Sequence, residues 1–131
     1  MKINKVGHIG INTGDFGKTM NFYRDILGFK QHETVPIHGF EITNVEAPDG
    51  TLVELFDYGL RTDKSVGDNS VVGYRHLAFE VDNVDEWEAH LRNHDIEIRM
   101  SATVMEELGI KGILCLDPDG TEIELFEPLP A

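Results

Sequence analysis

Cysteine, basic residues and long apolar runs are all scarce in this sequence of 131 residues. The only cysteine is Cys115, so no intrachain disulfide can form. There are 11 Lys and Arg residues against 24 Asp and Glu, and a net charge of -13 repels phosphate backbones and anionic lipids. The longest apolar run, Ile113 to Leu116, is far shorter than the roughly 20 residues of a membrane-spanning helix. We therefore expect neither a nucleic-acid partner nor a membrane partner.

The remaining composition is that of a globular chain. Apolar residues make up 40% and charged residues 27%, which is too hydrophobic for intrinsic disorder. Since domains commonly contain roughly 100 to 200 residues, the length predicts a single domain. The segment from Met1 to Asn12 has neither an apolar signal region nor a small-residue cleavage site. A cytoplasmic location is the corresponding expectation.

An internal repeat organises the sequence. The segment from Pro48 to Phe56 returns at Pro118 to Phe126 with seven identities in nine positions, at an offset of 70 residues. The segment from Gly7 to Ile11 matches Arg75 to Phe79 in residue type at an offset of 68. Self-similarity of this kind indicates two copies of one structural unit. The predicted organisation is a single domain at 1–131, with module 1 at 1–59, a connection at 60–71 and module 2 at 72–131.

Each module shows the same predicted order of one strand, one helix and three further strands. Apolar residues at helical spacing predict the helices, and alternating apolar residues predict the strands. The first helix is expected from Phe16 to Leu27 with Asp15 as N-cap, and the second follows Asp82 or Asn83. The predicted strands are 5–12, 29–35, 40–47 and 51–58 in module 1, and 74–81, 96–100, 111–117 and 121–126 in module 2. The fold class is therefore α+β with two tandem βαβββ modules, and residues 101–110 are predicted to be an insertion.

Two histidines and two glutamates occupy matching places in the two modules. Because side chains alternate along a strand, the first and last strands of each module place apolar residues on one face. The other face carries His8, Glu54, His76 and Glu124. A lone His or Glu on a strand is more often a hydrogen-bonded or solvated residue than a ligand, but the duplication favours a shared role. Imidazole and carboxylate groups bind divalent transition metals, and this set suits Ni, Co, Zn, Mn or Fe.

With these motifs the chain resembles the vicinal oxygen chelate superfamily, and in its ligand set the glyoxalase I-like lyases. The resemblance covers nearly the whole chain and depends on the repeated strands and on Asp117 to Gly120 followed by Ile123 to Leu125. It implies an open eight-stranded cup formed by the two modules. It also implies that the metal ligands are His8, Glu54, His76 and Glu124.

The resemblance further implies a divalent-metal-dependent lyase or isomerase of glyoxalase I type. Such an enzyme chelates vicinal oxygens of a small carbonyl substrate and transfers a proton through an enediolate. Glu124 would be the catalytic base, with Glu54 opposite it. Alternatives on the same fold are a methylmalonyl-CoA epimerase-like epimerase, an Fe(II) ring-cleaving dioxygenase and a non-catalytic drug-binding module. A glutamate at position 54 favours the lyase and isomerase branch over the dioxygenases.

Three further residues are candidates for substrate binding. Glyoxalase I commonly has an arginine for the glutathione carboxylate four residues after the first ligand, where this chain has Asn12. Four residues after the second ligand the chain has Tyr58 in place of the usual asparagine, so both positions disfavour glutathione as cosubstrate. His38 lies in a short connection between strands, from which a loop could reach substrate. Cys115, in an apolar strand, is expected to pack as a small hydrophobe. We expect a homodimer, with each site built within one chain or shared between two.

Overall fold

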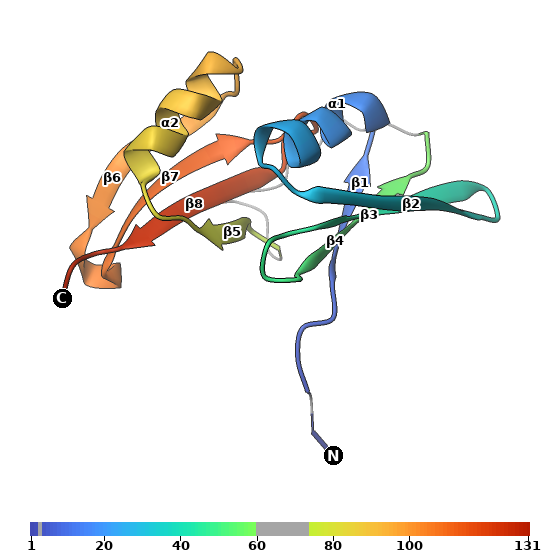
Figure 1. Cartoon of the computed structure of the whole chain (residues 1–131), viewed down its shortest axis with the longest axis horizontal. Helices are drawn as coiled ribbons and strands as arrows, with labels where there is room; N and C mark the ends of the chain where they lie inside the picture. Colours follow the sequence, from blue (N-terminus) through green and yellow to red (C-terminus); the bar gives the residue numbers. More distant parts are fainter. Residues whose placement is uncertain (3, 60–73) are drawn as a thin grey trace. The chain divides into compact units, whose positions relative to one another are not determined.

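The computed structural model describes residues 1–2, 4–59 and 74–131, and the chain divides into two compact units, Met1–Asp63 and Lys64–Ala131 (Figure 1). The predicted connection at 60–71 lies outside the described residues. Each unit has its own four-stranded sheet. In the parts of the chain that the structure describes, no helix is long and apolar enough to cross a membrane.

The described residues of unit 1 form four strands and one helical segment. The elements are β1 (Ile9–Thr13), α1 (Phe16–Met20), η1 (Asn21–Ile26), β2 (Lys30–Ile37), β3 (Phe40–Glu46) and β4 (Leu52–Asp57). The strand order is β1-β4-β3-β2. The first strand runs parallel to β4, and the other neighbours are antiparallel. The last strand of the unit therefore lies in the interior of the sheet, beside the first.

Unit 2 repeats this plan. Its elements are β5 (Leu77–Glu80), α2 (Val84–Asn93), β6 (Ile98–Met105), η2 (Glu106–Leu108), β7 (Ile110–Leu116) and β8 (Glu122–Pro128). The strand order is β5-β8-β7-β6, again with a parallel first pair. Ile9 opposes Val53 in unit 1, and Leu77 opposes Ile123 in unit 2, so the repeated segments pair in the same register. The α+β class and the repeated βαβββ order are confirmed.

Both helical segments begin at the predicted capping residues. Asp15 accepts a hydrogen bond from the Lys18 amide at 3.1 Å, and Asn83 accepts one from the Glu86 amide at 3.0 Å. Side-chain oxygens at these positions satisfy amides that have no partner inside the helix. The first helix continues as the π-helical segment η1 and ends before Gly28, whose positive φ of 82° suits glycine. The predicted helix is therefore present, with a wider second half.

The apolar faces of the first and last strands form the core, as the alternation predicted. Val53 and Leu55 are fully buried in unit 1, and Ile123 and Leu125 are buried in unit 2. Burying a side chain of this size stabilises the fold by roughly 1.5 to 3 kcal/mol. Helix α2 contributes the fully buried Leu91 and packs against β6, β7 and β8 (Figure 1). The opposite strand faces are left for the candidate site.

The first strand of each module begins later than the sequence predicts. Instead of starting at residues 5 and 74, the strands start at Ile9 and Leu77. Part of the reason lies in the partner strands, because β4 starts at Leu52 and β8 at Glu122, so that residues 5–7 and 74–75 extend beyond them. The first residue pairs are Ile9 with Val53 and Leu77 with Ile123. Residues before these pairs have no ladder partner. His8 and His76 consequently lie immediately before β1 and β5.

The predicted insertion at 101–110 is wrong. Strand β6 continues through this segment to Met105, and a short 3₁₀ turn leads into β7 at Ile110. Met105 pairs directly with Ile110, and Gly109 has the positive φ of 68° that closes the turn. The run from Ala102 to Val104 has the small and β-branched residues typical of a strand. The segment is thus a strand and the turn of a hairpin.

Candidate functional site

In unit 1 the structure brings the first predicted His and Glu together. His8 Nδ1 lies 3.5 Å from Glu54 Oε2. The His8 side chain is 51% exposed and that of Glu54 is 19% exposed, so a solvent molecule or ligand can reach both. Gly10 on β1 stands opposite Glu54 on β4 in the strand register. The parallel pairing of these strands is what brings a residue at the start of the module next to one near its end.

Unit 2 builds the same pair with a shorter distance. His76 Nε2 lies 2.9 Å from Glu124 Oε2, with side-chain exposures of 27% and 14%. Ala78 on β5 stands opposite Glu124 on β8, as Gly10 does opposite Glu54. Each unit therefore presents one imidazole just before its first strand and one carboxylate on its last strand. The ring nitrogen nearest the carboxylate is Nδ1 in His8 and Nε2 in His76.

The spacing within each pair fits two ligands of one metal ion. Nitrogen and oxygen ligands lie about 2.0 to 2.2 Å from such an ion, so two neighbouring ligands are about 2.8 to 3.1 Å apart at octahedral angles and about 3.3 to 3.6 Å apart at tetrahedral angles. The distances of 2.9 and 3.5 Å found here fall within these ranges, and 2.9 Å is also the length of a direct hydrogen bond. Among the residues that the structure describes, no group of three or more His, Cys, Asp or Glu side chains could hold a metal. Each unit by itself thus brings together two candidate ligands.

Glycines keep space open beside these pairs. A Cβ added at Gly112 on β7 would lie 3.6 Å from Glu124 Oε1 and 3.2 Å from Met105 Cε. A Cβ added at Gly10 would lie 3.2 Å from Phe56 Cε1, which is closer than most side chains tolerate. In both units a residue without a side chain therefore borders the strand that carries the candidate carboxylate.

Unit 2 contains a second carboxylate that the sequence analysis left without a role. Glu122 is only 3% exposed, and its Oε1 lies 3.5 Å from Arg75 Nη2 and 3.7 Å from His76 Nδ1. The alternation of β8 already placed Glu122 on the same face as Glu124, which is the signal that could have identified it. In unit 1, Asn44 on β3 stands opposite Glu54 on β4 in the strand register, and its Oδ1 atom is buried.

The three predicted substrate-binding residues have different surroundings. Tyr58, which follows β4, is 45% exposed and stacks on Phe40 with ring centroids 4.6 Å apart and planes at 30°. Phe56 extends this stack, at 6.1 Å from Phe40. Asn12 is exposed on β1 opposite Phe56, so it borders the same aromatic group. His38 is exposed in the turn between β2 and β3.

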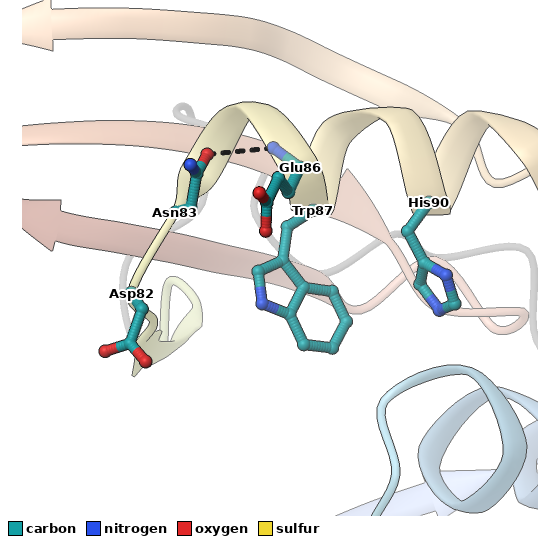
Figure 2. A pocket seen from close by; sticks show the side chains of 5 residues that line it. All are labelled: Asp82, Asn83, Glu86, Trp87 and His90. Atoms are coloured by element: carbon teal, nitrogen blue, oxygen red, sulfur yellow. Dashed lines mark hydrogen bonds between the residues drawn. The ribbon is translucent and has the colours of Figure 1, made fainter.

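A separate shallow pocket lies along the first turns of α2. Its lining residues are Asp82, Asn83, Glu86, Trp87 and His90 (Figure 2). Figure 2 shows the Asn83 cap bonded to the Glu86 backbone and the Trp87 ring pointing away from the helix axis. None of the predicted site residues lines this pocket. We therefore do not identify it with the candidate metal centre.

Cys115 is fully buried on β7. Burial and, to a smaller extent, the negative charge of Asp117 raise the pKa of its thiol to about 12. A thiol with this pKa is almost entirely protonated at neutral pH and is a poor nucleophile. The buried position agrees with the packing role expected from the sequence.

Comparison with known proteins points to one superfamily. The sequence model of the Glyoxalase/Bleomycin resistance protein/Dioxygenase superfamily matches residues 5–125. The uncharacterized protein YaeR of Escherichia coli (strain K12) is 31% identical over 130 residues, covering 95% of this chain and 97% of that protein. Mitochondrial methylmalonyl-CoA epimerase of Mus musculus is 32% identical over 89 residues, covering 63% of this chain and 49% of the epimerase.

The fold agrees with this assignment. The solved structure of the trypanothione-dependent glyoxalase I of Leishmania major is 28% identical and has a TM-score of 0.75, covering 95% of this chain and 87% of that one. The superfamily match spans both units and includes His8, Glu54, His76 and Glu124. The chain therefore belongs to the Glyoxalase/Bleomycin resistance protein/Dioxygenase superfamily, the vicinal oxygen chelate superfamily that its repeated motifs resemble.

Proposed function

We propose that this chain is a divalent-metal-dependent lyase or isomerase of glyoxalase I type. His8, Glu54, His76 and Glu124 would together bind one transition metal ion. The observation that supports this is the duplicated His–Glu pair, at 3.5 Å in unit 1 and 2.9 Å in unit 2, at matching places of the two units. When bound, the ion supplies Lewis-acid polarisation of the substrate's neighbouring oxygens. The mixed nitrogen and oxygen set suits Ni, Co, Zn, Mn or Fe.

Glu124 is the proposed base that takes a proton from the carbon next to a substrate carbonyl. Its side chain is largely buried yet 14% exposed, so a substrate proton can reach a carboxylate that is shielded from most of the solvent. A general base needs to lie within hydrogen-bond reach of the proton that it removes, and a carboxylate at the metal centre meets this need. Glu54 provides a second carboxylate, 19% exposed, to receive or return a proton on the other side of the substrate.

The substrate is proposed to be a small molecule that contacts the aromatic group of unit 1. Tyr58 would provide an apolar wall, since it is exposed and already held in place by stacking on Phe40. Asn12 would donate or accept hydrogen bonds beside it. His38, in the β2–β3 turn, is proposed as a third substrate contact.

Epimerisation of an acyl-CoA is the second candidate function. The observation in its favour is the 32% identity to mitochondrial methylmalonyl-CoA epimerase, which covers 63% of this chain. Both candidate reactions begin with removal of a proton next to a carbonyl, so both would use Glu124 as the base. They differ in the substrate that must be supplied.

Proton exchange is the experiment that tests the proposed function. The purified chain, loaded separately with each of the five metals, is incubated in D₂O with 2-oxoaldehyde thiol adducts, acyl-CoA esters and catechols. We expect deuterium to enter the carbon next to the carbonyl of one of the first two classes, and Glu124→Gln to abolish exchange while retaining part of the metal. Glu46→Gln is a matched control, because Glu46 forms a His–Glu pair with His32 at 3.0 Å outside the proposed ligand set.

Three outcomes would contradict the proposal. Oxygen uptake with catechols and Fe(II), without deuterium exchange, would instead identify a ring-cleaving dioxygenase. Tight binding of a drug-like ligand that chelators leave intact, again without exchange, would identify a non-catalytic binding module. Exchange that continues undiminished in Glu124→Gln would remove Glu124 as the base.

A homodimer is the proposed assembly. Sedimentation should give about twice the chain mass of 14.7 kDa. Mixing His8→Ala with His76→Ala then shows how the sites are built, because regained activity requires ligands from two chains. A monomeric mass would contradict the proposed dimer.

A further inference from the structure

Two buried polar atoms beside the candidate metal centre face each other without a hydrogen bond. His76 Nδ1 and Glu122 Oε1 are 3.7 Å apart, and neither has a hydrogen-bond partner among the described residues. Buried polar atoms are nearly always paired, so two such atoms at this distance are unusual. A nitrogen that donates and a carboxylate that accepts form a hydrogen bond at about 2.7 to 3.0 Å. A shift of less than about 1 Å would therefore join them.

The guanidinium of Arg75 balances the negative charge of Glu122. The residue is only 3% exposed, and a buried carboxylate is costly unless a cation or hydrogen bonds compensate it. Arg75 Nη2 lies 3.5 Å from the same Oε1 atom. Glu122 is therefore placed between a guanidinium and an imidazole, where it can act only as an acceptor.

The repeat shows that this arrangement is not required to build the sheet. At the positions matching Arg75 and Glu122, unit 1 has Gly7 and Leu52, and the strand pairing of that unit is the same. A charged pair present in one module and replaced by glycine and leucine in the other serves something besides the fold. One group within its reach is the His76 ring, whose Nδ1 lies 3.7 Å from Glu122 Oε1.

We propose that Glu122 is a positioning residue that orients His76 for metal binding. It accepts a hydrogen bond from Nδ1–H of His76, which fixes the ring tautomer and leaves the lone pair of Nε2 for the metal. Nε2 lies 2.9 Å from Glu124 Oε2, so the ring edge that would bind the metal already faces the other proposed ligand of the unit. This inference rests on the proposed function, because it requires His76 to be a metal ligand.

The test uses the full chain labelled with ¹⁵N-histidine and titrated with Zn²⁺ alone. NMR of the Zn²⁺-loaded chain identifies which nitrogen of His76 carries the proton, and His76→Ala assigns the signals. We expect the proton on Nδ1, slowly exchanging with water, and Zn²⁺ on Nε2. The dissociation constant for Zn²⁺ is then measured for Glu122→Leu, Glu122→Gln and the control Glu46→Gln.

Glu122→Leu introduces the residue of unit 1, and we expect it to weaken Zn²⁺ binding by roughly 10- to 100-fold and to speed exchange of the Nδ1 proton. Glu122→Gln keeps an acceptor oxygen, so it should restore most of the affinity and the slow exchange. Glu46→Gln should leave both unchanged. Rescue by glutamine separates a positioning role from a general loss of structure.

Two results would overturn the inference. The first is Zn²⁺ bound through Nδ1 of His76 in the unsubstituted chain, a result that does not depend on whether Glu122→Leu folds. Unchanged affinity and unchanged proton exchange in a folded Glu122→Leu would do so as well, while leaving the proposed function intact. Failure of the unsubstituted chain to bind Zn²⁺ or any of the other metals would remove the proposed function together with this inference.

Discussion

Removal of the Asp117 carboxylate should destabilise the turn that leads into the strand carrying Glu122 and Glu124. Asp117 is 4% exposed, and its Oδ1 accepts hydrogen bonds from the amides of Asp119 at 2.9 Å and Thr121 at 2.8 Å. Hydrogen bonds to a charged group contribute roughly 1.5 to 3 kcal/mol each. Two of them together would give about 3 to 6 kcal/mol if nothing replaced them.

Unit 1 shows what can replace part of this contribution. At the matching position it has Ala47, and the Thr51 amide donates to Asp49 instead, at 2.9 Å. The residue matching Asp49 in unit 2 is Asp119, so in Asp117→Ala this carboxylate can accept the Thr121 amide in the same way. About one hydrogen bond is then lost, and we expect a destabilisation of about 2 kcal/mol. In the double variant Asp117→Ala/Asp119→Ala neither carboxylate can accept the Thr121 amide, and the free energy of unfolding should fall by about 4 kcal/mol.

Urea denaturation followed by circular dichroism measures these changes, with the midpoint shifting and the m-value unchanged. Asp119→Ala alone is the control. It should change the free energy of unfolding by less than about 1 kcal/mol, because Asp117 still accepts the hydrogen bond from the Thr121 amide. The reasoning would be refuted if Asp117→Ala cost less than about 0.5 kcal/mol, or if the effects of the two substitutions were simply additive.

The thiol of Cys115, with a pKa raised to about 12, should react with a disulfide reagent at pH 8 on the order of 1000-fold more slowly in the folded chain than in urea; equal rates would contradict its burial. The folded pKa of this thiol lies above the ordinary value of 9.0, so its contribution to the free energy of unfolding should be complete below pH 9 and lost as the pH rises toward 12. Denaturation measurements on Cys115→Ala should not show this loss. Gly10→Ala should cost about 1 kcal/mol, because the new Cβ would lie 3.2 Å from the Phe56 ring, and Gly10→Ala/Phe56→Leu should recover part of that loss. No recovery in the double variant would show that the ring is not the obstacle.

Local patterns predicted most of the secondary structure because each depends on residues close in sequence. The repeated Pro-Asp-Gly-Thr turn, the caps Asp15 and Asn83, and the alternation around Val53 and Ile123 all act through neighbours along the chain. Strand starts were less accurate, because the start of β1 depends on where its partner β4 begins. The predicted insertion at 101–110 is wrong because the alternation of Ile98, Met100, Ala102 and Val104 continues the strand past Met100.

The candidate site could likewise be predicted only in part from the sequence. The matching places of His8 and His76 could be predicted, because duplication is visible in the sequence. Alternation along β8 places Glu122 on the face of Glu124, but its proposed role could not be predicted, because its burial and its distance of 3.5 Å to Arg75 result from the parallel pairing of β5 with β8. Likewise, the stacking of Tyr58 on Phe40 depends on the register of β3 against β4.

Metal stoichiometry is the most direct test of the proposed centre. The chain is loaded with each divalent metal, dialysed, and analysed for metal content beside His8→Ala and His76→Ala. The proposal predicts one bound ion per chain and its loss in both variants, although the two histidines belong to different units. Metal retained in either variant at the unsubstituted level, or absent from the unsubstituted chain, would contradict a single centre formed by the two His–Glu pairs.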